Sequence, residues 1–178
     1  VLGRVNRLFL PFCEKLLSGY IDIKKLPKKY KKKFFHVGQL VRNEFLEISK
    51  IKSSTKPKKS LLKILILGGS QGAKVFGEKL PRCFSSLNTS KIQLSIKQQV
   101  QKQQIFKINE FYKNNVKFDV ALFEFENNIH DFIIESDVVI CRSGSSTIAE
   151  LSVLNKPFIA IPLPSSLDNH QYFNAKYY

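Results

Sequence analysis

Two short turns rich in glycine and serine are the stretches of this sequence best suited to bind a charged ligand. Residues 68–72 read GGSQG and residues 142–146 read RSGSS, and each follows an apolar run typical of a strand and precedes a helical pattern. A turn that leads into a helix presents free backbone N–H groups and the positive end of the helix dipole, which suits a phosphate group. One such turn is weak evidence, because tight turns need glycine anyway. Two turns that converge indicate a nucleotide-phosphate site.

The first turn does not have the spacing of the G-x-G-x-x-G dinucleotide fingerprint. No acidic residue ends a second strand about 20 residues further on, as that fingerprint requires. A different nucleotide-binding α/β protein, such as half of an NAD-dependent dehydrogenase, is therefore disfavoured. The chain also contains no D-x-D pair, so we expect neither a metal ion that holds a diphosphate nor any other cofactor.

The elements that must position these turns alternate between strand and helix patterns from residue 61 onward. Residues 61–67 read LLKILIL, a run too apolar to have a solvated face, which is typical of a parallel strand covered on both sides. The other expected strands are residues 92–96, 116–125, 137–141 and 157–162. The expected helices are residues 73–86, 102–112, 129–135 and 147–154, with Phe76 and Phe84 in the core. This order predicts an α/β fold with a doubly wound parallel sheet, whose ligands bind at the carboxyl ends of the strands.

The first 49 residues predict a separate and smaller part of the fold. Apolar residues at helical spacing favour a helix within residues 1–17, with Phe12 in the core. The further expected elements are short strands at 18–21 and 34–37, a turn at 38–42 and a helix at 43–48. Residues 50–60 have the Ser, Thr and Pro content of a linker. We therefore expect two domains, residues 1–49 and residues 61–178.

The formal net charge of +15 is concentrated in two lysine-rich segments. Residues 24–33 hold seven lysines and residues 50–63 hold six, so the rest of the chain carries 16 basic and 14 acidic residues. Segments of this kind are most often solvated loops. The other interpretation is attraction to anionic lipid headgroups, where each lysine can contribute about 1 kcal/mol. Nucleic acid is not expected as a partner, because no RRM, KH or zinc-finger pattern accompanies the charge.

The remaining composition is that of a globular protein, with 43% hydrophobic residues. Three widely spaced cysteines predict neither a disulfide framework nor a metal site, and they favour a reducing cytosol. No apolar run approaches the roughly 20 residues of a membrane span. The chain starts at Val1 and contains no Met, so we expect a fragment that is cut at both ends.

Several motifs accompany the two turns. They are GGSQGA at residues 68–73, CRSG at 141–144, TIAE at 147–150, and Asp168 followed by QYFNA at 171–175. Together they resemble the MurG family, the bacterial transferases that add N-acetylglucosamine to lipid I to form lipid II in peptidoglycan synthesis. The resemblance implies the glycosyltransferase B arrangement of two Rossmann domains. Residues 1–49 would then end the acceptor-side domain, and residues 61–178 would form most of the donor-side domain.

The resemblance also implies how matching residues bind the donor, UDP-N-acetylglucosamine (UDP-GlcNAc). Ser70 would contact the pyrophosphate, Arg42 would lie near the interdomain cleft, and the backbone of Glu126 would meet the uracil. Glu150 would accept hydrogen bonds from the ribose hydroxyls, and Gln171 would read the hydroxyls of the transferred sugar. The other residues expected near the diphosphate and ribose are Arg142, Ser145, Ser146, Thr147, Ile148 and Ala149.

The implied reaction is an inverting single displacement in which a sugar hydroxyl of lipid I attacks and UDP leaves. A base must take the hydroxyl proton, and the resemblance places it in the acceptor-side domain, ahead of Val1. We therefore expect no catalytic residue in this chain. The expected partners are UDP-GlcNAc, lipid I and an anionic membrane surface, at the cytoplasmic face of the bacterial inner membrane. The alternative is a decayed or non-catalytic fragment of the same fold that binds the nucleotide sugar without turnover.

Some of these residues also have a structural interpretation. Thr147 and Glu150 have the spacing of a capping box, in which Glu150 would tie down the start of its own helix. Arg142 could pair with a carboxylate as readily as with a phosphate. Cys141 is expected to pack within its strand. The three histidines are expected in surface or hydrogen-bonded positions rather than in catalysis.

Two positions depart from the family pattern. The family's Gly-Asn-Pro-Val-Arg turn has Gln39 and Leu40 in place of Asn-Pro. Loss of the proline frees φ, so we expect a looser turn behind Arg42. Asn155 stands where a glycine usually ends the helix, and asparagine tolerates the left-handed conformation that such a position requires.

Overall fold

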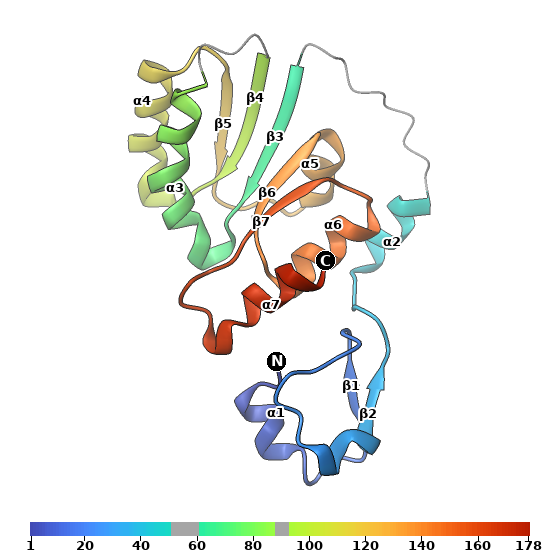
Figure 1. The fold of residues 1–178 in the computed structure, drawn as a ribbon. Helices are drawn as coiled ribbons and strands as arrows, with labels where there is room; N and C mark the ends of the chain where they lie inside the picture. The colour runs from blue at the N-terminus through green and yellow to red at the C-terminus, as the bar shows by residue number, and fades with distance from the viewer. Residues whose placement is uncertain (51–60, 88–92) are drawn as a thin grey trace.

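The computed structural model describes residues 1–50, 61–87 and 93–178. Its main unit is a five-stranded parallel sheet with the order β5-β4-β3-β6-β7 (Figure 1). The strands are β3 (Leu61–Leu67), β4 (Gln93–Gln99), β5 (Asp119–Phe123), β6 (Val138–Arg142) and β7 (Phe158–Ile161). This is the predicted doubly wound order, in which the chain starts at the central strand and moves first to one edge and then to the other.

Helices cover both faces of this sheet (Figure 1). On one face lie α3 (Gly69–Ser85) and α4 (Ile105–Asn115), and on the other lie α2 (Asn43–Lys50), α5 (Ile129–Glu135) and α6 (Ser145–Val153). Alternate residues of β3 serve the two faces: Ile64 and Ile66 pack in the first hydrophobic cluster and Leu65 in the second. A strand buried on both faces has no polar alternation, which is why its sequence is continuously apolar.

The expected core positions of α3 are confirmed, since Phe76 and Phe84 are both buried. The glycine turn at residues 68–72 is tighter than expected, because α3 already begins at Gly69, whose φ is +62°. The predicted end of the fourth strand at residue 96 is wrong, as β4 continues to Gln99. The strand was underestimated because its last residues are polar, which an apolar pattern does not detect.

A smaller unit is formed by the first 36 residues. It contains α1 (Arg4–Phe9), the 3₁₀ helix η1 (Lys28–Lys33), and the strands β1 (Leu16–Ser18) and β2 (Phe34–His36), which pair in parallel. The expected helix within residues 1–17 is therefore much shorter than its apolar pattern, because Pro11 has no N–H group with which to continue the helical hydrogen bonds. Phe12 is 83% exposed, so its assignment to the core is wrong.

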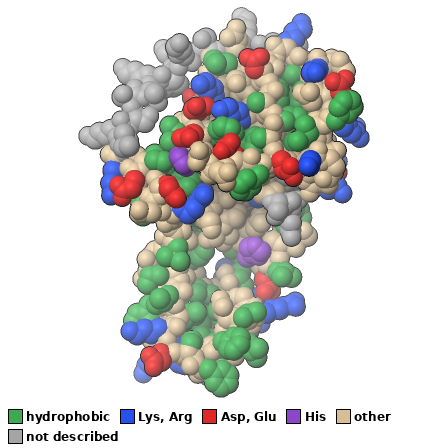
Figure 2. All heavy atoms as spheres, turned by 180° about the vertical axis from the view of Figure 1, so that it is seen from behind, with side chains coloured by type: hydrophobic (Ala, Val, Ile, Leu, Met, Phe, Trp, Pro, Cys, Tyr) green, Lys and Arg blue, Asp and Glu red, His purple; other side chains and the backbone are tan. Residues whose placement is uncertain are grey.

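Apolar side chains are exposed on this smaller unit, as Figure 2 shows from behind. The exposed residues of and after α1 are Val5, Leu8, Phe9 and Phe12. The turn after α1 is held by the ammonium group of Lys33, which donates to the carbonyl oxygens of Leu10, Pro11 and Cys13. One lysine of the first lysine-rich segment thus has a structural role instead of a solvated one.

Helix α2 packs with the main unit, although the sequence analysis grouped it with the first 49 residues. Its Phe45 is fully buried in the cluster that contains Leu65, Val139 and Leu151. Residues 37–42, between β2 and α2, therefore join the smaller unit to the main unit. We call these residues the connecting segment. The expected linker at residues 50–60 lies outside the described residues except for Lys50, the last residue of α2.

The buried position of Phe45 leads to a test of this assignment. Phe45→Ala should lower the free energy of unfolding by about 3–5 kcal/mol, because it removes a buried aromatic ring and leaves a cavity. The measurement is urea unfolding followed by circular dichroism. Leu46→Ala, on the same helix but 39% exposed, is the control and should cost less than about 1.5 kcal/mol. Equal losses for the two variants would contradict the packing of α2 on the sheet.

Candidate functional site

A cavity of about 600 Å³ opens at the carboxyl ends of β3, β4, β5 and β6. The glycine turns form part of its wall, through Gly68 and Gly69 after β3 and Gly144 after β6. Six of the residues expected at the donor site also line it: Arg42, Glu126, Arg142, Thr147, Glu150 and Gln171. The structure thus brings together residues from the connecting segment, from four strand ends and from helices of the main unit.

Glu150 and Arg42 form an ion pair at one side of this cavity. The Arg42 Nε donates to Glu150 Oε1 at 2.7 Å, and its second guanidinium nitrogen donates to Oε2 at 3.2 Å. The side chain of Glu150 is only 11% exposed, whereas that of Arg42 is 50% exposed and lies over the Phe45 ring. The hydrogen bond and charge of Glu150 raise the pKa of the Arg42 guanidinium above its ordinary value. The capping-box interpretation is wrong, because α6 begins at Ser145 and Glu150 lies in its second turn.

Arg142 ends β6 and is 9% exposed. One of its terminal nitrogens donates to the carbonyl oxygens of Ile161 and Pro162, at 3.3 Å and 3.1 Å, and its guanidinium lies over the Phe76 ring. The expected alternative, pairing with a carboxylate, is wrong, since its partners in the described part of the chain are carbonyl oxygens. Its Nε is buried with no hydrogen-bond partner among the described residues. Burial lowers the pKa of this guanidinium, because the charged group is partly desolvated.

Two further side chains fix the shape of the cavity wall. Glu126 accepts a hydrogen bond from the Asn128 backbone N–H at 2.9 Å, which holds the loop after β5. Gln171, on α7 (His170–Tyr177), accepts one from the Leu163 backbone N–H at 2.9 Å. Each side chain keeps polar atoms that a ligand can bind, because a carboxylate has a second oxygen and an amide has an NH₂ group.

Four other expected site residues do not present side chains to this cavity. Ile148 and Ala149 are buried in the protein, so only backbone groups there could meet a ligand. Ser145 and Ser146 line a second cavity, of about 980 Å³, between α6 and the smaller unit. The Ser145 hydroxyl accepts from the Tyr20 hydroxyl and donates to Gln39 Oε1. Ser70 lies in the first turn of α3, and its side chain is not among those described.

Gln99 is a site residue that the sequence analysis missed. Its side-chain oxygen accepts a hydrogen bond from the Gly69 N–H at 3.0 Å, and its NH₂ group donates to the Glu124 carbonyl oxygen. It therefore joins the glycine turn after β3 to the loop after β5. Its position at the carboxyl end of the neighbouring strand could have indicated this role, had the expected strand not ended three residues too early. Phe125, 74% exposed at the cavity, was missed as well.

The QYFNA motif, on α7, contacts the turn that precedes α6. The buried Asn174 donates its side-chain N–H to the Ser143 carbonyl oxygen at 3.0 Å, which holds the turn that precedes α6. After α6 the chain turns at Asn155, whose φ is +49°. The expected left-handed conformation at that position is confirmed.

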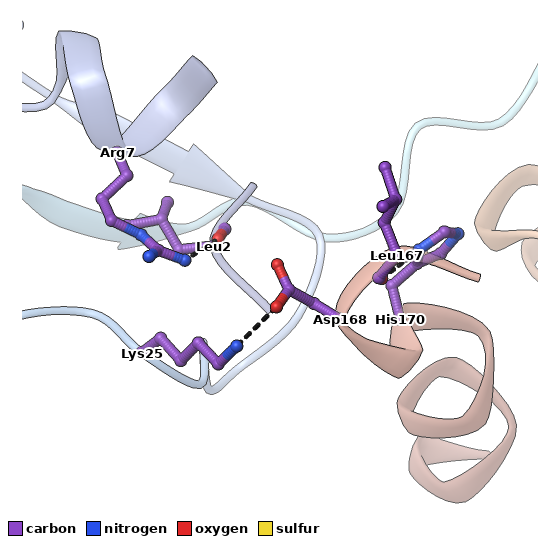
Figure 3. Close-up of polar contacts among 6 residues, drawn as sticks. All are labelled: Leu2, Arg7, Lys25, Leu167, Asp168 and His170. Carbon is purple, nitrogen blue, oxygen red and sulfur yellow. Dashed lines mark hydrogen bonds and ion pairs between the residues drawn. The ribbon is translucent and has the colours of Figure 1, made fainter. Parts of the chain in front are cut away.

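Asp168 points toward Lys25 of the smaller unit (Figure 3), and it lines the second cavity instead of the first. It pairs with Lys25 at 2.5 Å, and this ion pair holds the pKa of the Asp168 carboxyl below its usual value. The backbone here is unusual, since Asp168 and Asn169 both have φ near +54°. Lys24 lies over the Phe173 ring at 3.9 Å. Two lysines of the first lysine-rich segment, Lys24 and Lys25, thus contact α7 or the turn before it.

The remaining expectations concern single residues. Cys141 is fully buried in β6, as expected, and burial raises the pKa of its thiol to about 12. His170 Nδ1 is hydrogen-bonded to the Leu167 carbonyl oxygen (Figure 3), and His130 lies beside the Phe45 ring.

Among the described residues, no group of His, Cys, Asp and Glu could hold a metal ion. No described helix is long and apolar enough to cross a bilayer.

Comparison with known proteins identifies the main unit. The model of the Glycosyltransferase family 28 C-terminal domain matches residues 63–178. The chain belongs to this family. The match begins within β3 and includes both glycine turns and every helix and strand from α3 to α7.

Relatives also cover the smaller unit. The chain is 40% identical over 99% of its length to a Rickettsia canadensis protein named UDP-N-acetylglucosamine--N-acetylmuramyl-(pentapeptide) pyrophosphoryl-undecaprenol N-acetylglucosamine transferase. It is 39% identical over 98% of its length to the Rickettsia bellii protein of the same name. In each case the chain spans 49% of the relative, about half its length. The resemblance to the MurG family is confirmed.

A solved structure supports the fold. The crystal structure of Acinetobacter baumannii MurG superimposes with a TM-score of 0.74 at 23% identity, over 98% of this chain and 47% of that chain. The α/β arrangement of glycosyltransferase B type is therefore confirmed.

Proposed function

We propose that this chain carries the UDP-GlcNAc site of an inverting glycosyltransferase that converts lipid I into lipid II in peptidoglycan synthesis. The observation that carries the proposal is the convergence of Arg42, Glu126, Arg142, Glu150 and Gln171 on one cavity at the carboxyl ends of the strands. That edge is where doubly wound sheets bind ligands. The names of the Rickettsia relatives supply the reaction and its substrates.

Glu150 is suited to bind a pair of neighbouring hydroxyl groups. Its two carboxylate oxygens can accept from two donors, and hydrogen bonds to a charged acceptor are about twice as strong as neutral ones. Because the side chain is largely buried, a ligand hydroxyl that donates to it exchanges its hydrogen bonds with water for a charge-assisted hydrogen bond. The ribose of a uridine nucleotide offers such a pair.

The diphosphate would lie between the two glycine turns and Arg142. Gly144 precedes α6 without a side chain that caps the helix, so the first N–H groups of α6 are not covered by a side-chain cap. Arg142 lines the same wall and pairs with no carboxylate among the described residues, so its positive charge is available to a diphosphate. Preorganised donors of this kind stabilise the negative charge that develops on UDP as it leaves.

Two loops would determine which base and which sugar bind. The Glu126 carboxylate holds the Asn128 N–H, which sets the backbone of the loop expected to meet the uracil. Gln171 is held by Leu163 through its oxygen, which leaves its NH₂ group to donate to a sugar hydroxyl. The side-chain roles of Ile148 and Ala149 are limited to the support of α6, because both are buried.

We place the border between the two domains at residues 37–42 instead of 50–60. In this proposal the smaller unit belongs to the acceptor-side domain and the main unit, with α2, is the donor-side domain. The two-stranded parallel sheet of the smaller unit supports this division, since parallel sheets are normally larger and covered on both faces. The base that takes the acceptor proton would come from the acceptor-side domain.

We also propose that the smaller unit faces an anionic membrane, at the cytoplasmic surface of the bacterial inner membrane. Exposed apolar residues of α1 lie on the same unit as the exposed lysines of η1. An apolar surface with lysines around it binds peripherally to anionic lipid.

The donor site can be tested by binding of UDP-GlcNAc, followed by ligand-observed NMR, with UDP and NAD as comparators. We expect UDP-GlcNAc and UDP to bind and NAD not to bind. Glu150→Ala should weaken binding by about 10- to 100-fold, because it removes charge-assisted hydrogen bonds of about 1.5–3 kcal/mol. Glu47→Ala, which removes an exposed carboxylate of α2, is the matched control and should bind normally. Equal binding by the two variants, or absence of binding by a folded chain, would contradict the proposal.

The membrane surface can be tested by sedimentation with vesicles of phosphatidylcholine that contain or lack phosphatidylglycerol. The triple variant Lys28→Glu, Lys31→Glu, Lys32→Glu should bind anionic vesicles roughly 100-fold less tightly, since each lysine contributes about 1 kcal/mol. A second triple variant with the same charge change serves as the control: Lys74→Glu, Lys79→Glu, Lys107→Glu on the helices α3 and α4. Equal losses in the two variants would show attraction by net charge alone, and the membrane-facing surface would be wrong.

A further inference from the structure

The connecting segment, residues 37–42, is attached to the donor-site helix α6 at two points. Near its start, Gln39 accepts a hydrogen bond from the Ser145 hydroxyl at 3.1 Å, and Ser145 is the first residue of α6. At its end, Arg42 is bound to both oxygens of Glu150 in the second turn of the same helix. The segment that joins the two units therefore runs along α6 and is fastened to it.

The two attachments differ in strength. The bond between Gln39 and Ser145 is a single contact between neutral groups. The contact between Arg42 and Glu150 is bidentate and charged on both sides, which makes it the stronger of the two and fixes the orientation of both groups. Arg42 therefore provides most of the restraint that α6 exerts on the segment.

Arg42 binds the same carboxylate that the ligand is proposed to bind, that of Glu150. Glu150 lines the main cavity, and both of its oxygens accept from the guanidinium. Each carboxylate oxygen has two lone pairs, so ligand hydroxyl groups that approach Glu150 from the side of the guanidinium compete with Arg42, whereas hydroxyl groups on the free lone pairs bind beside it. The exchange is feasible for both groups. Arg42 is half exposed, so water can hydrate the guanidinium once it leaves Glu150. The buried Glu150 carboxylate stays hydrogen-bonded, because the ligand hydroxyl groups replace the guanidinium as donors.

We propose that the Arg42–Glu150 pair is a latch between the connecting segment and α6, and that ligand hydroxyls open it. The inference rests on the proposed UDP-GlcNAc site. When the donor's ribose binds Glu150, the Arg42 guanidinium is released toward the cavity and the connecting segment loses its stronger attachment. Occupancy of the donor site is thereby coupled to the freedom of the smaller unit to move against the main unit.

The remaining contacts between the units determine how far such motion extends. The ion pair between Lys25 and Asp168 is exposed, and pairs of that kind contribute little to stability. Three further contacts join the units: the edge-to-face contact between the Tyr20 and Tyr177 rings at 5.0 Å, the hydrogen bond from the Tyr20 hydroxyl to Ser145, and the position of Lys24 over the Phe173 ring. Each is a single weak contact. The latch is thus the only bidentate ion pair between the connecting segment or smaller unit and the main unit among the described residues.

The chain's own cysteines allow the motion to be measured. Cys13 lies in the smaller unit and Cys83 on α3, both at least partly accessible, whereas Cys141 is fully buried and should not react. Spin labels on Cys13 and Cys83 report the distribution of distances between the units by pulsed electron paramagnetic resonance. The samples are the full chain and its Arg42→Ala variant, each alone, with UDP and with 2′,3′-dideoxy-UDP, and ligand binding is verified separately by NMR.

The latch predicts a specific pattern. UDP should broaden or shift the distance distribution of the wild type, and Arg42→Ala should show the altered distribution without ligand and change little when UDP is added. The dideoxy analogue, which lacks the hydroxyl pair, should bind more weakly and leave the wild-type distribution unchanged at saturation. Lys25→Ala, which breaks the other ion pair between the units, is the control and should respond to UDP as the wild type does.

Two results would overturn the latch. The first is an Arg42→Ala distribution identical to that of the unliganded wild type, which needs no ligand to interpret. The second is UDP that binds to the wild type without changing the distribution. Absence of UDP binding would instead contradict the proposed function, while the comparison of the two unliganded proteins would still decide whether Arg42 restrains the connecting segment.

Discussion

The pairing of β3 with β6 is the constraint on which the candidate site depends. In this parallel pair Leu67 lies opposite Cys141, so the glycine turn after β3 and Arg142 at the end of β6 leave the sheet side by side. Both strands are buried on both faces, and a slip of one residue would move every side chain to the wrong helix layer. The hydrophobic core thus fixes where the phosphate-binding groups stand, although none of those groups belongs to the core.

Several of the lysines that contribute to the net charge of +15 make specific structural contacts. In the first lysine-rich segment, Lys33 holds the carbonyl groups after α1, and Lys24 and Lys25 contact Phe173 and Asp168. Lys33 thus stabilises the smaller unit, and Lys24 and Lys25 connect it to α7 and to the turn before α7. The lysines of η1 between them are the ones left for an external partner, which is why their surface and not the net charge carries the membrane proposal.

The sequence was sufficient to predict the sheet, its two covered faces and the edge at which the site lies, because those features follow from apolar runs and glycine turns. It was not sufficient where the outcome depends on a distant partner. Glu150 has the local spacing of a helix cap, yet it binds Arg42, 108 residues away in the sequence. Phe12 has the helical spacing of a core residue, but Pro11 ends the helix and leaves the ring exposed. Helix α2 carries no local sign of the sheet against which Phe45 packs.

We propose that the cavity beside the two glycine turns binds a uridine diphosphate sugar. The most direct measurement is an ¹⁵N-labelled titration of the chain with UDP-GlcNAc that maps shifts of individual backbone amides. We expect the largest shifts in the turns after β3 and β6, in residues 144–150, and in the loop at residues 125–127, with small shifts along α4. Shifts concentrated at the second cavity, around Tyr20 and His170, would contradict this location of the donor site.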